Sequence, residues 1–82
     1  SGCSEKYPGV PEEYWSRLDS AFQEAGANAV ELKKALAEAP SDEKEGMAFL
    51  IANMPERDLK TLTSAFLLEN VEYAYKARNK YP

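Results

Sequence analysis

A ten-residue apolar stretch at 46–55, Gly-Met-Ala-Phe-Leu-Ile-Ala-Asn-Met-Pro, constrains the fold of this chain more than any other feature. A helix over this stretch has apolar side chains on nearly all of its sides, and such a helix belongs in a core, where several neighbours cover it at once. The chain has 82 residues, and a domain of about that size buries roughly 60–65% of the surface that its unfolded form exposes. We therefore expect one compact core, with barely enough chain to cover the stretch.

Composition excludes several classes of function. The net charge of −4 argues against nucleic acid as a partner, because binding to phosphates requires clustered lysine and arginine. The chain has no histidine, which excludes a Ser–His or Cys–His dyad and a histidine-bound metal within these residues. Its single cysteine forms no internal disulfide, and the longest apolar run is broken at Asn53 and Pro55 before it is long enough to span a bilayer. We expect no cofactor.

The amino end, Ser1-Gly2-Cys3-Ser4, resembles the end of a bacterial lipoprotein signal peptide, where small residues precede the cysteine that carries the lipid. Under this interpretation Cys3 is a lipidation site, the protein is extracytoplasmic (periplasmic or at the cell surface), and the lipid is its only contact with a membrane. The alternatives are a free cysteine at a frayed terminus and, for the first two residues, a vector remnant. Residues 1–10 are predicted to be a flexible tether, since they contain a Pro-Gly turn signal.

Two helices are predicted in the first half of the chain, near 11–25 and 29–39, from apolar residues at helical spacing. Gly26 suits the left-handed position that ends a helix. Asn28 is expected to cap the second helix, and Glu31, three residues later, to complete a capping box. The short link between the two helices favours an antiparallel hairpin.

Two further helices are predicted near 42–53 and 64–80. Pro55 ends the first of them, because a residue that precedes proline avoids helical angles. The segment 56–63 is predicted to be a charged connection, which Leu59 and Leu62 pin to the core.

These patterns predict an all-α domain over 11–82, with four helices, the first two forming the hairpin and the helix at 46–54 central. The polar residue within the apolar stripe of the last helix is Asn70, and a buried asparagine must have its hydrogen bonds satisfied. Either Asn70 lies at the edge of the stripe and bonds water or a loop carbonyl, or it ties the connection at 56–62 to the last helix.

The run MAFLIANMPERDLKTLTSAFLLENVEYAYKARNKYP at 47–82, preceded by NAVELKKALAEAP at 28–40, resembles the helical region at the start of bacterial secreted transglutaminase-like proteins. In that group a pattern like N-x-x-E-L-x-K-x-L leads to F-L-I-x-N-M-P and then to L-x-x-x-F-L-x-x-N-V-E-x-A-Y. The matching residues are Asn28, Glu31, Leu32, Lys34 and Leu36, then 49–51 and 53–55, and then Leu62, Phe66, Leu67, 70–72, Ala74 and Tyr75.

The resemblance implies that a papain-like catalytic domain with a Cys-His-Asp triad lies further along the chain. These residues contain no histidine, and Cys3 lies at the terminus, so the triad is not among them. The resemblance therefore implies a non-catalytic accessory domain of a secreted or lipid-anchored protein, which positions or shields a downstream catalytic domain of the same chain. The alternative is a free-standing helical module that offers the 47–54 face or the tyrosine cluster near the end of the chain to a partner protein. An independent enzyme is disfavoured, because no acid–base constellation is present.

Tyrosines crowd the end of the last predicted helix, at Tyr73, Tyr75 and Tyr81. Tyrosine is enriched at interfaces, since it combines an apolar body with a polar tip. Together with Arg57 and Leu59 in the preceding connection, these residues are predicted to dock against the neighbouring domain. A domain separated from its neighbour exposes apolar surface, so the isolated chain is expected to form a homodimer.

Two other groups of residues have simpler explanations than a binding or catalytic site. Tyr7, Tyr14 and Trp15 have the chemistry to stack on a sugar, but core packing and a folded-back tail explain them better. Glu43 and Glu45 resemble a pair of catalytic carboxylates, but acids at the start of a helix are favoured by its dipole and need no further role.

Overall fold

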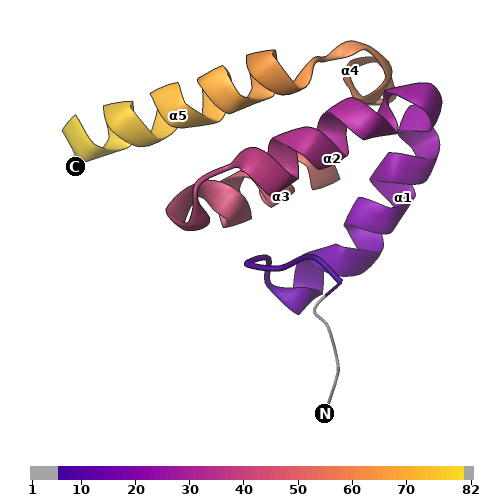
Figure 1. Cartoon of the computed structure of the whole chain (residues 1–82), viewed down its shortest axis with the longest axis horizontal. Helices are drawn as coiled ribbons and strands as arrows, with labels where there is room; N and C mark the ends of the chain where they lie inside the picture. The colour runs from indigo at the N-terminus through magenta and orange to yellow at the C-terminus, as the bar shows by residue number, and fades with distance from the viewer. Residues whose placement is uncertain (1–5, 81–82) are drawn as a thin grey trace.

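The computed structural model describes residues 6–80, with side chains to Arg78, and this part of the chain is helical with no strand (Figure 1). Its α-helices are α1 (Trp15–Ala25), α2 (Ala29–Glu38), α3 (Lys44–Ala52), α4 (Glu56–Thr61) and α5 (Ser64–Lys80). Single turns of 3-10 helix precede the first three of these, at η1 (Glu12–Tyr14), η2 (Gly26–Asn28) and η3 (Ser41–Glu43). The prediction of a small all-α domain is confirmed.

The core takes its largest fully buried side chains from four of the helices: Leu18, Leu32, Met47, Ile51 and Leu67. Helix α3 packs against α1, α2 and α5, while α2 packs against all four other α-helices, so the centre of the domain is shared by α2 and α3. Helix α2 runs back from the end of α1, and the two splay apart from the turn that joins them (Figure 1). Gly26 makes this turn with φ 59° and ψ −125°, a conformation that side chains rarely adopt.

The charged connection at 56–63 contains a helix that the sequence pattern does not indicate, α4 (Glu56–Thr61), and the expected packing of Leu59 on the core is confirmed. Pro55 precedes this helix with φ −62° and ψ 152°, which suits a residue that introduces a first helical turn. Leu59 is buried in the core, whereas most of the other α4 side chains are exposed. A six-residue helix is not stable on its own, so α4 depends on the packing of Leu59.

Residues 6–10 do not form the predicted tether; they pack against the helices and are called here the amino-terminal strap. Val10 is buried in the core, and its carbonyl accepts a hydrogen bond of 3.0 Å from the indole nitrogen of Trp15. The folded-back tail is therefore confirmed for this segment. Residues 1–5, with the lipidation candidate Cys3, lie outside the described residues.

Asn28 and Glu31 do not form the predicted capping box. Asn28 has helical angles (φ −79°, ψ −3°) and its side chain does not cap α2, because the turn η2 already leads into the helix, whereas a capping residue needs non-helical angles. Its side-chain amide donates instead to the carbonyls of Leu59 (2.8 Å) and Leu62 (2.9 Å). Glu31 accepts a 2.8 Å bond from the backbone N–H of Ser64. These two side chains, the Asn28–Glu31 clamp, hold the link between α4 and α5.

Asn70 lies exposed on α5, and its side-chain amide donates to the carbonyl of Phe66 in the same helix at 3.1 Å. It does not tie 56–62 to α5, which is the function of the clamp. The start of α5 is capped by Thr63, whose hydroxyl accepts from the backbone N–H of Phe66 at 3.2 Å.

Candidate functional site

Helix α3 buries only part of its apolar surface. Met47, Ala48 and Ile51 are fully buried, whereas Phe49 is 56% exposed and Leu50 is 37% exposed. Across from them on α5, Phe66 is 52% exposed. Large apolar side chains gathered at one place on a surface mark a site of interaction more often than isolated ones do.

These exposed residues line a groove of about 570 Å³, called here the α3–α5 groove. It is lined by Gly46, Phe49, Leu50 and Asn53 on α3 and its end, by Met54, Pro55, Asp58 and Leu62 around α4, and by Phe66, Leu67, Asn70, Val71, Ala74 and Tyr75 on α5. Both walls are helical, so the site stands on rigid elements.

Tyr75 lies directly against the backbone of α3 at Gly46. A Cβ atom on Gly46 would be 2.7 Å from the Tyr75 hydroxyl oxygen and 2.8 Å from its Cε1 atom, which is closer than such atoms pack. Glycine at this position therefore permits the close approach of the tyrosine ring to the helix. The ring forms part of the groove wall at this point.

Acidic side chains lie around the middle of the groove, and the basic Arg78 lies at one end of it, a helical turn beyond Ala74 and Tyr75. Asp58 is the charged residue among its lining. Glu45 and Glu69 are exposed and lie about one helical turn from Phe49 and Phe66, respectively, which places each on the same face as its phenylalanine. Such a rim favours a partner with basic groups beside its apolar surface.

The predicted docking residues are only partly brought together. Tyr75 lines the groove, whereas Tyr73 is 75% exposed outside it and Arg57 is exposed on α4 outside it. Leu59 is buried, so its prediction as a docking residue is wrong; α4 turns it into the core. Tyr81 lies outside the described residues.

Phe49 belongs to the 47–54 face that a free-standing module is expected to offer to a partner, but the sequence pattern singles out neither Phe49 nor Phe66 as an exposed site residue. The available signal was the width of the apolar face on 46–55, which exceeds what a domain of this size can cover.

A polar network fixes the strap on the other side of the molecule. The hydroxyl of Tyr7 donates to Asp19, and the ammonium of Lys6 lies 2.5 Å from the same carboxylate. Burial, and then the hydrogen bond to Asp19, raise the pKa of Tyr7 to about 12. The hydrogen bond from Lys6, and then that from Tyr7, lower the pKa of Asp19. These groups hold the strap against α1.

Within residues 6–80, no group of three or more acidic, histidine or cysteine side chains is placed to hold a metal ion. No helix in the same range has the length and apolar character needed to cross a membrane. Comparisons with protein-family models, curated proteins and solved structures give no match for this chain.

Proposed function

We propose that this chain is a non-catalytic helical docking domain, which binds an apolar segment of a protein in the α3–α5 groove. The observation that carries the proposal is the groove itself, in which Phe49 and Phe66 stay more than half exposed on opposing helices. Grooves between helices commonly accept the apolar face of an amphipathic helix. The acidic rim at Glu45, Asp58 and Glu69 favours basic residues on the flanks of that helix.

The resemblance suggests where this segment comes from. The residues that line the groove are largely those that carry the likeness to the transglutaminase-like proteins, so we propose a transglutaminase-like catalytic domain of the same polypeptide as the partner. Docking would position or shield that domain without contributing a catalytic residue. In this form of the proposal the protein is extracytoplasmic, with the lipid on Cys3 as its membrane anchor.

A free-standing binding module is the second candidate, and one observation favours it. Every wall of the groove comes from residues 46–75 of this single chain, so the site forms without help from a neighbouring domain. The same groove would then bind a segment of a separate protein.

A peptide titration tests the docking proposal. The probe is a helical peptide of about 14 residues, or roughly four turns, with leucines at i, i+3, i+4 and i+7 and lysines on both flanks. We expect it to bind, and we expect Phe66→Glu to weaken binding by at least about tenfold, as loss of a central apolar anchor does. Val30→Glu is the matched control, because Val30 is 66% exposed on α2 and lies outside the groove.

Two outcomes of that titration contradict the proposal. One is equal weakening by Val30→Glu and Phe66→Glu, which would indicate non-specific contact. The other is equal binding of the same peptide with glutamates in place of lysines, which would remove the role assigned to the acidic rim.

Separate measurements test the identity of the partner. The reading frame, sequenced past Pro82, is expected to continue into a domain with the Cys-His-Asp triad, and a stop codon there would contradict a partner in the same chain. Mass spectrometry of the native protein from its host is expected to find a diacylglyceryl group on Cys3, and an unmodified Cys3 would contradict the anchor. Neither outcome bears on the groove.

A further inference from the structure

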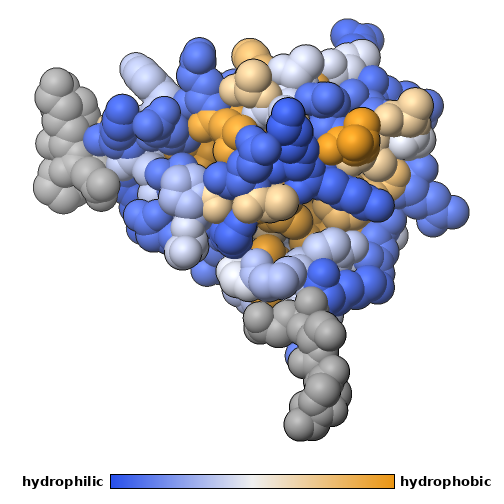
Figure 2. Space-filling view, in the orientation of Figure 1, coloured by the Kyte–Doolittle hydropathy of each residue, from blue (hydrophilic) through white to orange (hydrophobic). Residues whose placement is uncertain are grey.

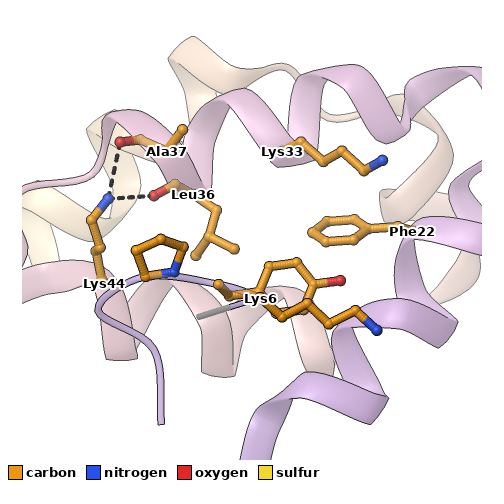
Figure 3. A pocket seen from close by; sticks show the side chains of 8 residues that line it. Lys6, Phe22, Lys33, Leu36, Ala37 and Lys44 are labelled. Carbon is orange, nitrogen blue, oxygen red and sulfur yellow. Dashed lines mark hydrogen bonds between the residues drawn. The ribbon is translucent and has the colours of Figure 1, made fainter. Parts of the chain in front are cut away.

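A second cavity, of about 450 Å³, lies between the amino-terminal strap, α1, α2 and the first residue of α3, and is called here the strap cavity. Hydrophobic surface shows between α2 and the strap on this face of the molecule (Figure 2). Leu36 points into the space between Phe22 and Lys44 (Figure 3). The rings of Tyr7 and Phe22 pack with centroids 5.8 Å apart. The cavity therefore has a fixed apolar lining.

The charged side chains that line this cavity are all lysines: Lys6, Lys33 and Lys44. The ammonium of Lys44 donates to the carbonyls of Leu36 (2.8 Å) and Ala37 (2.9 Å) at the end of α2, as Figure 3 shows. Lys6 pairs with Asp19.

Lys33 differs from the other two lysines, because within the described residues its ammonium has neither an ion-pair partner nor a hydrogen-bond acceptor, whereas Lys6 pairs with Asp19 and Lys44 donates to two carbonyls. Its ammonium lies over the ring of Phe22, 5.5 Å from the centroid. The three lysines and the Asp19 carboxylate that pairs with Lys6 carry together two positive charges, in a chain whose net charge is −4.

We infer that the strap cavity binds a single-chain amphiphile with a carboxylate head. The apolar chain would lie on Phe22 and Leu36, and the carboxylate would accept a charge-assisted hydrogen bond from Lys33, which lies at the edge of that surface. The volume falls toward the lower end of the range of about 300–1,000 Å³ that small-molecule sites occupy, which suits one chain. A cationic ligand would meet lysines on every charged side of the cavity, and a neutral one would leave Lys33 without a counter-charge.

The site is independent of the docking groove, since the two share no lining residue. A ligand in the strap cavity would contact the strap, α1 and α2 together. It would therefore hold the strap onto the helices and stabilise the folded chain by mass action.

Titration of the full chain with decanoate, monitored by amide chemical shifts, tests the inference. We expect shifts at residues 6–8, 33–37 and 44, and weaker binding of decanol. Lys33→Gln is expected to weaken decanoate binding by about tenfold, which is the loss expected for one charge-assisted hydrogen bond. Lys34→Gln is the matched control, because this neighbouring exposed lysine does not line the cavity and is expected to leave the affinity unchanged.

Three outcomes overturn the inference. In the first, decanoate and decanol bind equally well, or Lys33→Gln and Lys34→Gln have the same effect, so that no cation selects the head group. In the second, the shifts fall on the α3–α5 groove, which would leave the docking proposal standing and this one contradicted. In the third, monomeric decanoate does not bind whereas anionic phosphatidylglycerol vesicles bind through Lys33, so that the lysine contacts a lipid surface.

Discussion

Single polar side chains hold together parts of this domain that are far apart in sequence. The bonds of the Asn28–Glu31 clamp join residues 31 to 34 positions apart, and they satisfy carbonyl and N–H groups at the link between α4 and α5. Such groups have no partner within a helix, because they lie at its ends. The clamp therefore fixes where α5 begins, and with it one wall of the groove.

Asn28→Ala tests the clamp at the level of one residue. It leaves the carbonyls of Leu59 and Leu62 without their donor, and we expect a loss of about 1–3 kcal/mol in the free energy of unfolding, as for partly buried groups left unsatisfied. Asn70→Ala is the control, because Asn70 is exposed and bonds only within its own helix; it is expected to change stability by no more than about 0.5 kcal/mol. Urea unfolding followed by circular dichroism measures both. Equal losses would show that Asn28 has no special role.

The decrease in the free energy of unfolding at acid pH tests the contribution of Glu31 to the clamp. The hydrogen bond from the Ser64 backbone, and then that from its hydroxyl, lower the pKa of Glu31. A carboxyl whose pKa is lower in the folded than in the unfolded chain stabilises the fold fully above the ordinary glutamate value, and this contribution is lost as the pH falls through the lowered value. We expect Glu31→Gln to flatten the decline of stability in acid. Glu38→Gln, an exposed change on the same helix, is expected to leave the decline unaltered, and a similar flattening would contradict the assignment.

At the scale of the helices, the positions of the helices that local sequence patterns determine could be predicted from the sequence. Periodic apolar residues and helix stops at Gly26 and Pro55 located α1, α2, α3 and α5 to within a few residues. Helix α4 has one core side chain, Leu59, among charged neighbours, and its structure depends on tertiary packing and on the clamp. No local pattern contains that information.

The candidate site was predictable only in part, for a related reason. Tyr73 and Tyr75 were grouped by residue type, but residues two apart on a helix face different directions, and only Tyr75 lines the groove. The exposure of Phe49 and Phe66 depends on how α3 and α5 are placed relative to each other. Local sequence patterns do not specify this placement. Gly46 was noted only as the first residue of the apolar stretch, although its role is to admit Tyr75.

A double-mutant cycle at Gly46 and Tyr75 tests the packing of α3 against α5. Alanine favours a helix interior over glycine by about 1 kcal/mol, so Gly46→Ala is expected to stabilise the Tyr75→Ala variant by about that amount. In the wild-type chain the new methyl group meets the tyrosine ring, so we expect the gain to vanish or reverse. Chemical unfolding of the four proteins measures the difference. An equal gain in both backgrounds would show that Tyr75 does not lie on Gly46.

At the scale of the whole molecule, the groove follows from the shape. The principal extents of the chain are 36 × 36 × 18 Å, and a helix with its side chains is about 10–12 Å across, so the body is roughly two helices thick. In a molecule only about two helices thick, the neighbouring helices cannot cover every side of α3, which has apolar side chains on nearly all of its sides. The apolar surface of α3 is therefore divided between the core and the open α3–α5 groove.

Self-association of the isolated chain is the expected consequence of the open groove. Sedimentation velocity over a range of concentrations is expected to show a weak monomer–dimer equilibrium, because each copy has an apolar groove to cover. Phe66→Glu is expected to shift the equilibrium to monomer, and Val30→Glu to leave it unchanged. A strict monomer at every concentration would contradict self-association through this face.

The α3–α5 groove is proposed to be a docking surface for an apolar protein segment with basic flanks. An amide chemical-shift titration of the full chain with the lysine-flanked leucine peptide tests this without intermediate steps. We expect shifts confined to residues 45–55, 58 and 62–75, and we expect these shifts to be lost in Phe66→Glu. Shifts centred on the strap and α2, or no shifts at any peptide concentration that keeps the peptide soluble, would contradict it.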